Sequence, residues 1–417
     1  LSSSSAASDV YKRQHYGRVT AYVSGGYGAD TILVTDSGAG FLGNLFGLTL
    51  VSVDAGPGQD RISVSGSLST SITTGDDSDT VVLTAQQYRT LLEGVRTFTN
   101  TDSSTTTANP EPIQITDFTS GSGGDVLDYG DLLRNASLTY DGSNPFSSGF
   151  ISLQQSGTDT LVAFDADGSA GTSQASVVIA ILKNVVATTL TADNFNPNFP
   201  PDGSPVAAQD ITGTPLADNL LGGSGNDQIN GLDGNDTIDG QAGSDTIYGG
   251  SGDDRIEGNF GNDVLWGESG DDTITDDQGS NILDGGSGND TLTSRSLFGN
   301  HILLGGAGSD WLSATGFIVR LEGGDQQDYL WAGGQLDSTS YVQSGSATLL
   351  GGAGPDNLGV SYYSNVELQG GDDNDVLHTR YSRNSVIHGE GGNDSISIGI
   401  ENYLSLIHIS EPTRPRL

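Results

Sequence analysis

The sequence predicts an all-β protein whose main part is a parallel β-roll, a solenoid of short strands and tight turns. Glycine is abundant, with 62 residues, and only 34% of the residues are hydrophobic, so a conventional core is hard to build. A nine-residue period runs through the middle of the chain, with one aliphatic residue in each period. A thin repetitive core accounts for both observations, because stacked repeats bury a continuous interior that no single repeat could bury alone.

The period is strictest between 222 and 293, where eight consecutive units follow one pattern. Glycine recurs at positions one and four, aspartate at position six and an aliphatic residue at position eight. A disordered low-complexity segment would not need Ile or Leu at every ninth residue, so the period indicates folded coils. The units read GGSGNDQIN, GLDGNDTID, GQAGSDTIY, GGSGDDRIE, GNFGNDVLW, GESGDDTIT, DDQGSNILD and GGSGNDTLT.

Aspartate at position six is suited to bind Ca²⁺, which takes about six to eight oxygen ligands from carboxylates and backbone carbonyls. We expect two units, each of six turn residues and three strand residues, in every coil of 18 residues. Adjacent coils then offer paired carboxylates on one edge, such as Asp227 with Asp245 and Asp236 with Asp254. Glycine lets the turn adopt positive φ and point its carbonyls inward. The aliphatic residues are assigned to the interior: Ile229, Ile238, Ile247, Ile256, Leu265, Ile274, Leu283 and Leu292.

This G-G-x-G-x-D-x-U-x pattern resembles the repeat of the RTX, or haemolysin-type, calcium-binding proteins. The resemblance implies a β-roll that binds Ca²⁺, is exported by the type I secretion machinery, and folds outside the cell or at its surface. It also implies that the position-six aspartates ligate the metal. In the tandem run these are Asp227, Asp236, Asp245, Asp254, Asp263, Asp272 and Asp290.

Beyond Thr293 the strict period breaks, but the same turn recurs in steps of 18 to 28 residues. We expect one edge of these later coils to keep aspartate, while the other edge carries Asn300, Asn365 and Asn384. The metal candidates on the aspartate edge are Asp310, Asp328, Asp356, Asp375 and Asp394.

Three positions depart from the pattern. Asn281 replaces the aspartate that would pair with Asp263, and its amide carries no charge, so we expect that site to be weak or empty. Gln326 and Asp373 replace the glycine at position four, which puts the geometry of those two turns in doubt.

Three weaker copies of the repeat precede the tandem run, beginning at Gly25, Gly56 and Gly75. They predict an earlier, degenerate roll over 15–84. The sequence TAQQ at 84–87 resembles a helix-capping pattern and predicts a short helix, followed by a linker, within 85–112. The metal candidates of this earlier roll are Asp30, Asp60 and Asp79.

Residues 113–196 differ in character, because alternating strands such as DTLVAF are separated by polar turns. This stretch resembles the β-sandwich module found beside RTX rolls in serralysin-like proteases, so an intervening β-sandwich is expected. Its D-x-D-G turn at Asp165 and Asp167 could bind a further ion, but a plain hairpin turn is the favoured interpretation. A linker over 197–218 would then lead into the tandem roll at 219–293 and an irregular, one-sided roll at 294–403.

Both ends of the chain resemble translated sequencing adapters. SSAASDVYKRQ at the beginning and LSLIHISEPTR at the end match the same adapter pair. We therefore expect 1–14 and 404–417 to be artefacts outside the fold, and the remainder to be a fragment of a longer protein.

The charge restricts the partners. The sequence has 53 acidic and 15 basic residues, a net charge of −38 that argues against nucleic acid or an anionic membrane and favours multivalent cations. No apolar run approaches the roughly 20 residues needed to cross a bilayer, so membrane insertion is not expected. The chain has no cysteine, which is compatible with an extracellular protein held together by metal instead of disulfides.

No enzyme motif is visible, since neither HExxH nor G-x-S-x-G occurs. The favoured interpretation is a non-catalytic, calcium-binding part of a large secreted or surface-attached bacterial protein such as an adhesin, with a cell-surface glycan or protein as a candidate partner. The alternative is the calcium-binding region of a secreted metalloprotease, lipase or polysaccharide epimerase whose catalytic domain lies outside this sequence.

Overall fold

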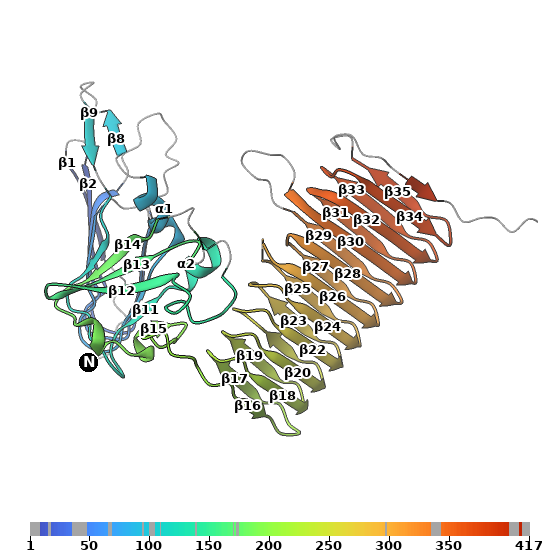
Figure 1. The fold of residues 1–417 in the computed structure, drawn as a ribbon, viewed down its shortest axis with the longest axis horizontal. Coiled ribbons are helices and arrows are strands. Elements are labelled where there is room, and N and C mark those ends of the chain that lie inside the picture. Colours follow the sequence, from blue (N-terminus) through green and yellow to red (C-terminus); the bar gives the residue numbers. More distant parts are fainter. Residues whose placement is uncertain are drawn as a thin grey trace, which may run out of the picture. The chain divides into compact units, whose positions relative to one another are not determined.

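The structure is a computed structural model in which the chain forms two compact units (Figure 1). The first unit comprises Leu1–Tyr140 with Asn144–Pro205, and the second comprises Asp141–Ser143 with Val206–Leu417. No helix in the described part of the chain has the length and apolar character to span a membrane. The described residues are 9–15, 18–35, 48–65, 69–93, 96–99, 105–108, 110–137, 140–169, 171, 175–296, 298–334, 343–399 and 408–410.

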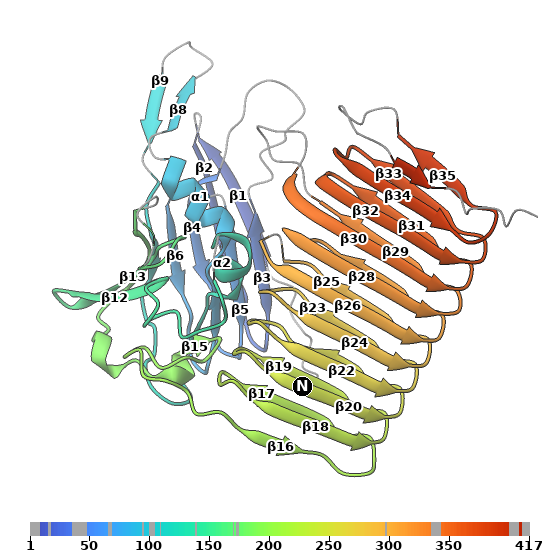
Figure 2. The same ribbon diagram turned by 45° about the vertical axis from the view of Figure 1, so that its right-hand side comes forward.

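The second unit is a β-roll of flattened coils with two parallel sheets (Figures 1 and 2). Successive strands of each sheet pair in parallel, and Ile229 lies opposite Ile247, so each tandem coil advances by the predicted 18 residues. The first sheet contains β16 (Asp210–Thr212), β18 (Gln228–Asp233), β20 (Thr246–Ser251), β22 (Val264–Ser269), β24 (Ile282–Ser287), β26 (Asn300–Ala307), β28 (Ile318–Asp325), β30 (Gln343–Ala353), β32 (Tyr363–Asp372), β34 (Ser385–Glu390) and β36 (His408–Ser410).

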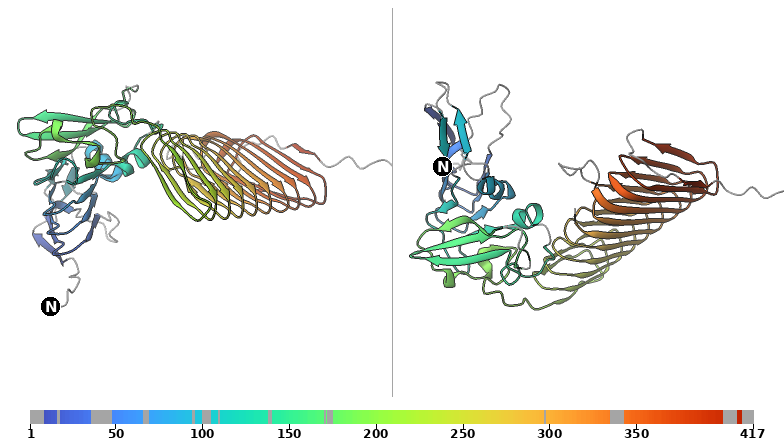
Figure 3. Two further views of the ribbon diagram at one scale, coloured as in Figure 1. Left: turned by 90° about the horizontal axis from the view of Figure 1, so that it is seen from below. Right: turned by 45° about the horizontal axis from the view of Figure 1, so that its top comes forward.

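The second sheet alternates with the first along the chain, because each coil contributes one strand to each sheet (Figure 3). Its strands are β17 (Asn219–Gly223), β19 (Thr237–Gln241), β21 (Arg255–Glu257), β23 (Thr273–Asp276), β25 (Thr291–Ser294), β27 (Trp311–Ala314), β29 (Tyr329–Gly333), β31 (Asn357–Ser361), β33 (Val376–Arg380) and β35 (Ser395–Ile398). The predicted β-roll is therefore confirmed.

A single column of aliphatic side chains fills the space between the two sheets. All eight predicted interior residues of the tandem run are buried, with exposed fractions of 0 to 1%. The column continues through Leu303, Leu321, Leu349 and Leu368 of the later coils. The core is thin because each strand directs only alternate side chains inward.

Glycine is required where the turns of adjacent coils approach each other. Gly261 has a φ of +148°, and a Cβ there would overlap the carbonyl oxygen of Gly243, one coil earlier. Any other residue at this turn would be strained and would push the coils apart. The glycine pattern thus permits the close stacking that the strand pairing requires.

The first unit contains a second, shorter roll. Its parallel strands are distributed over two sheets, ordered β2-β4-β6-β10-β14 and β3-β5-β7-β11-β15. The strands are β2 (Arg18–Ser24), β3 (Thr31–Thr35), β4 (Leu48–Asp54), β5 (Arg61–Ser65), β6 (Thr70–Thr73), β7 (Thr80–Val82), β10 (Ile113–Ile115), β11 (Val126–Asp128), β14 (Val177–Leu182) and β15 (Phe195–Asn196).

The first unit differs from the expected division into a roll and a separate sandwich. β10 pairs in parallel with β6, and β11 pairs in parallel with β7, so the described part of 113–196 extends the sheets of the earlier roll. Only β12 (Ile151–Ser156) and β13 (Asp159–Phe164) add antiparallel strands at one edge, beside β14. Alternating polar and apolar residues indicate a half-buried strand but do not specify its neighbour, which is why the sequence could not distinguish the two arrangements.

The first unit also contains short helices. The predicted helix is present as α1 (Ala85–Glu93), and the Thr84 hydroxyl accepts a hydrogen bond from Gln87 N–H, 3.1 Å away. Where a linker was expected, β8 (Arg96–Thr99) and β9 (Thr105–Ala108) form an antiparallel pair. The remaining helices are α2 (Gly130–Asn135), η1 (Ala187–Thr189) and η2 (Ala192–Asn194).

Both adapter-like segments contribute backbone to sheets in the structure. β1 (Asp9–His15) pairs antiparallel with β2, and β36 pairs in parallel with β34. The described parts of these segments, 9–14 and 408–410, therefore lie within the sheets, in contrast to the expectation that both segments lie outside the fold.

Candidate metal sites

A continuous line of aspartates, which we call the long aspartate ladder, runs along one edge of the second unit. Each member after the first accepts a hydrogen bond at Oδ1 from the backbone N–H of the member one coil earlier; for example, Asp236 N–H donates to Asp254 Oδ1 over 2.7 Å. These bonds confirm that the predicted pair of Asp236 and Asp254 shares an edge. The ladder comprises Asp218, Asp236, Asp254, Asp272, Asp290, Asp310, Asp328, Asp356, Asp375 and Asp394.

The opposite edge carries a second line, the short aspartate ladder, formed by Asp227, Asp245 and Asp263. Asp227 N–H donates to Asp245 Oδ1 over 2.8 Å, and Asp245 N–H donates to Asp263 Oδ1 over 2.7 Å. The line ends at Asn281, whose Oδ1 accepts from Asp263 N–H at 3.0 Å. The predicted pair of Asp227 and Asp245 therefore also shares one edge.

The second carboxylate oxygen, Oδ2, behaves differently from Oδ1 in both ladders. Except in the terminal members Asp218 and Asp394, it is buried and has no hydrogen-bond partner among the described residues. Burying a charged oxygen without a donor is costly, so the arrangement calls for a cation. These unpartnered oxygens belong to Asp227, Asp236, Asp245, Asp254, Asp263, Asp272, Asp290, Asp310, Asp328, Asp356 and Asp375.

The unpartnered oxygens face backbone carbonyls across the glycine at position one. A methyl group placed on Gly222 would lie 2.8 Å from Asp227 Oδ2 and 2.6 Å from the carbonyl oxygen of Gly240, one coil further on. Carboxylate and carbonyl oxygens from two coils thus converge on the space that the glycine leaves open. This donor set suits Ca²⁺, which prefers hard oxygen ligands of both kinds.

The family comparison agrees with this geometry. A family model described as the RTX calcium-binding nonapeptide repeat, in four copies, matches residues 212–247, 231–265, 239–274, 257–292, 304–338 and 382–402. The second unit is an RTX β-roll. RTX repeats bind calcium in such a roll, and that the ladder aspartates are the ligands stays a prediction. No curated protein matches the chain as a relative.

Burial makes the ladder carboxylates of the RTX roll difficult to ionise without a cation. Loss of hydration, with a smaller contribution from the charges of Asp263 and Asp227, raises the pKa of Asp245 to about 8 despite a lowering by the Asp227 N–H. On the long ladder, the same causes raise the pKa of Asp328 to about 8 and of Asp272 to about 7. A calcium ion must therefore displace protons from these groups when it binds.

The two turns that lack glycine at position four keep the shape of the turn. Gln326 and Asp373 adopt the left-handed conformation, with φ of +74° and +77°. Asp328 and Asp375, which follow them, remain in the long ladder with Oδ2 unpartnered. The substitutions therefore add backbone strain but leave the ligand positions in place.

The short-ladder edge of the RTX roll changes after Asn281. The expected Asn300, Asn365 and Asn384 lie on this edge, apart from the long ladder, and Asn384 Nδ2 donates to Asn365 Oδ1 over 3.2 Å. The ladder position itself passes to buried residues that lack a carboxylate. In order along the edge they are His301, Val319, Ala347, Val366 and Ser385.

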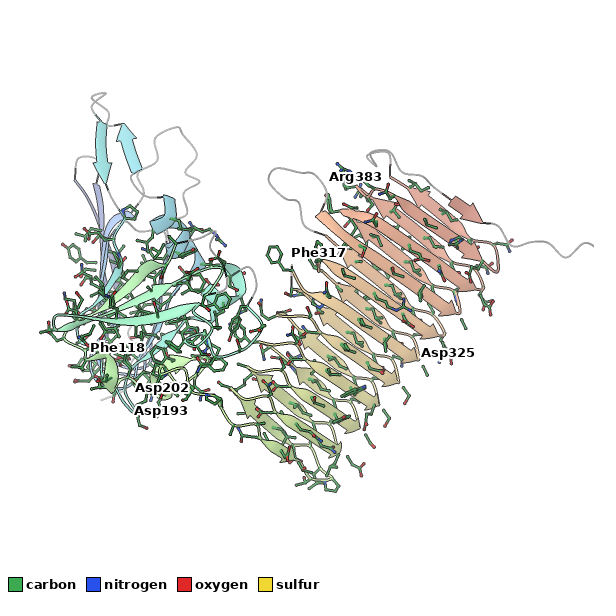
Figure 4. All side chains as sticks on the ribbon, in the orientation of Figure 1. Phe118, Asp193, Asp202, Phe317, Asp325 and Arg383 are labelled. Atoms are coloured by element: carbon green, nitrogen blue, oxygen red, sulfur yellow. The ribbon has the colours of Figure 1, made fainter. Side chains whose placement is uncertain are left out.

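Packing and neutral hydrogen bonds close this edge in the later coils, where we call it the apolar edge. Tyr363 is fully buried, and its hydroxyl donates to the carbonyl oxygen of Gly316 over 3.0 Å. His301 Nδ1 lies 2.9 Å from Ser294 Oγ, and burial lowers the pKa of the histidine, which favours its neutral form. Figure 4 shows the contrast along β28, with Phe317 at the apolar edge and Asp325 at the long-ladder edge.

The first unit has a ladder of its own. Asp30 N–H donates to Asp60 Oδ1 over 2.7 Å, and Asp60 N–H donates to Asp79 Oδ1 over 2.8 Å. The Oδ2 atoms of Asp30, Asp60 and Asp79 are buried and unpartnered among the described residues, as in the RTX roll. The family match does not extend to these coils, so calcium binding here stays a prediction.

Asp125 ends this ladder in a different way. Its Oδ1 accepts from Asp79 N–H at 3.0 Å, and its Oδ2 accepts from Thr119 N–H at 2.8 Å and from the Thr74 hydroxyl at 3.1 Å. Protein donors thus satisfy both oxygens where the other members leave one free. Asp125 closes the ladder with hydrogen bonds and needs no cation.

Three carboxylates that the structure brings to the ladders are not among the predicted metal ligands. Asp218 follows Gly213 by five residues, as in a regular unit, and this spacing could have revealed it. Asp125 precedes Leu127 as a ladder aspartate precedes its aliphatic residue, but the surrounding sequence has no period. Asp276 stands at position one, where the repeat pattern assigns no ligand.

The D-x-D-G turn lies directly after β13. Asp167 N–H donates to Asp165 Oδ1 over 3.2 Å, a bond typical of a polar turn. The choice between a plain hairpin turn and an ion site stays a prediction.

Proposed function

We propose that the chain is a non-catalytic, calcium-dependent folding module of a secreted or cell-surface bacterial protein. The protein would pass through a type I secretion machinery unfolded and would fold when it meets calcium outside the cell. RTX repeats are typical of secreted proteins, which supports this location. A glycan or protein of the cell surface would be the partner of the folded parent.

One observation carries the proposal: the ladders stack buried carboxylates whose Oδ2 atoms have no donor among the described residues. Each coil adds a charge that its neighbours repel, and the thin core offers little to offset the loss of chain entropy. Calcium neutralises the charge and supplies the missing partner, so its binding free energy becomes part of the folding free energy. The chain is therefore expected to fold only where calcium is sufficient.

Calcium concentration would act as the signal for location. Extracellular calcium modules bind with dissociation constants of about 10⁻⁴ to 10⁻³ M, far above the range of about 10⁻⁷ to 10⁻⁵ M to which cytosolic sensors are tuned. The module would stay unfolded inside the cell and fold after export, because a ligand that binds only the folded state stabilises it by mass action.

Circular dichroism of the full chain against calcium concentration tests the proposal. We expect a change from a largely disordered spectrum to a β-rich one at submillimolar to millimolar Ca²⁺, and its reversal by a chelator. Magnesium at the same concentration is the control, since its smaller ion demands a tighter octahedral site and should not replace calcium. A β-rich spectrum that persists in excess chelator would contradict calcium-dependent folding.

A further inference from the structure

Asp276 occupies a position that is glycine in every other tandem unit of the RTX roll. Its side chain is buried, with an exposed fraction of 1%. Oδ1 accepts a hydrogen bond from Gln278 N–H at 3.1 Å, whereas Oδ2 has no partner among the described residues. The repeat pattern gives this carboxylate no role, yet it is held inside the roll without a donor.

The free oxygen of Asp276 points into the last position of the short aspartate ladder. A methyl group placed on Gly258 would lie 2.7 Å from Asp263 Oδ2 and still closer to Asp276 Oδ2. At the equivalent position beside Gly222, the partner of the aspartate is the carbonyl oxygen of Gly240. The Asp276 carboxylate therefore reaches the place where a backbone carbonyl faces the ion in a regular coil.

Asn281 contributes no negative charge to this position. Its Oδ1 accepts from Asp263 N–H, and its Nδ2 donates to the carbonyl oxygen of Gln278 over 2.9 Å. The amide thus preserves the ladder hydrogen bond but adds no negative charge. A regular pair of coils has two ladder carboxylates, such as Asp245 and Asp263, and here Asp276 supplies the second one.

We propose that Asp263 and Asp276 together hold a Ca²⁺ ion at the end of the short ladder, with Asn281 keeping the coils in register. Two buried carboxylates that converge without a donor repel each other, and a divalent cation between them satisfies both. This inference rests on the proposed calcium binding of the roll but assigns a ligand outside the repeat pattern. It also reverses the expectation that Asn281 leaves a weak or empty site.

Calorimetric titration of the full chain with Ca²⁺ can count the ions bound by each variant. Asp276→Asn keeps the shape of the side chain and removes its charge, and we expect it to lose one bound ion per chain. Asp276→Gly restores the regular glycine and should lose the same ion. Adding Asn281→Asp to Asp276→Gly rebuilds an ordinary pair of ladder carboxylates and should recover it. Asp233→Asn removes the same charge from an exposed position of β18 and should leave the count unchanged.

The outcomes separate this inference from the function on which it rests. If the unaltered chain binds no Ca²⁺, the proposed function fails. If it binds Ca²⁺ and both Asp276 variants bind the same number of ions, calcium binding stands and the assignment of Asp276 is overturned. Such a result would mean that Asp263 and Asp276 share a proton instead of an ion. The Asp276→Gly variant keeps the test decisive even if Asp276→Asn fails to fold, because glycine is the residue that the other coils use.

Discussion

The two edges of the RTX roll close their coils with different kinds of side chain. Along one edge, the long aspartate ladder continues from Asp218 to Asp394. Along the other, the ladder ends at Asn281, and Val319, Val366 and the buried Tyr363 take over. The comparison shows that a coil can be closed by carboxylates that need a cation or by side chains that pack. If calcium binds the ladders as proposed, the tandem coils depend on it at both edges, whereas the later coils depend on it at one.

Calcium removal should separate the two kinds of coil most strongly. In excess chelator, we expect amides of the tandem run, 222–293, to lose protection from hydrogen exchange first. Amides of the later coils should retain more, because one of their edges is held by packing. Hydrogen exchange with peptide-level mass spectrometry measures both regions in one sample. Equal loss of protection in the two regions would show that the apolar edge adds no independent stability.

A carboxylate introduced into the apolar edge should lower the stability of the roll nearly as much as calcium removal does. Val366→Asp places a charge at a buried ladder position whose neighbours in the adjacent coils, Ala347 and Ser385, carry no carboxylate, and we expect it to destabilise the roll by about 3 kcal/mol. Val376→Asp, on the exposed face of β33, is the matched control and should change stability little. Urea denaturation in saturating calcium measures the difference. A neutral effect of Val366→Asp would show that this edge can still accept a cation.

Removal of single ladder carboxylates should act through calcium affinity. Asp254→Ala and Asp245→Ala should each weaken two neighbouring sites, and loss of a charged ligand worth about 1 to 3 kcal/mol corresponds to roughly 5- to 150-fold weaker binding at each site. The calcium midpoint by circular dichroism should rise for both. Asp394→Ala is the internal control, since Asp394 is only half-buried and its effect should be smaller. A larger effect for Asp394 would mean that burial does not set the strength of the ladder.

Acidity should partly replace calcium. Burial raises the folded-state pKa of Asp254 to about 6, of Asp272 to about 7 and of Asp245 to about 8, above the unfolded value of about 4. A raised pKa gives a calcium-free roll stability that is present below about pH 4 and is lost as the pH rises through the folded values. We therefore expect the calcium-free chain to gain β-structure on acidification from pH 8 to pH 4, and the calcium midpoint to rise over the same range. Circular dichroism at several pH values measures both trends.

The sequence predicted the tandem coils well because each unit contains its own turn, strand and core residue. The 18-residue register, the edge assignment of Asp236 and Asp254, and the burial of Ile229 all follow from counting. Residue spacing no longer gives the register where insertions change the number of residues per coil. His301 follows Asn281 by 20 residues, so its place on the ladder edge is visible only from the pairing of β24 with β26.

Other features depend on contacts that no local pattern encodes. β10 joins β6 although Gln114 and Ser71, its partner, are far apart in the sequence and share no repeat. Asp276 could be identified as an acid at position one, but that its free oxygen faces Asp263 follows only from the stacking of two coils. Long-range pairing and side-chain direction therefore had to come from the structure.

The hydrogen bonds of the ladders give the roll a polarity. Each ladder aspartate donates its N–H to the coil that follows it, as Asp356 does to Asp375 over 2.9 Å. Backbone donors at the same edge run the other way, because the residue after each ladder aspartate donates to the coil before it, as Val376 N–H does to the Asp356 carbonyl oxygen over 2.8 Å. Each interior coil is therefore tied to both of its neighbours. A coil at either end of the stack lacks one of these two partners, so the roll should fray from its ends.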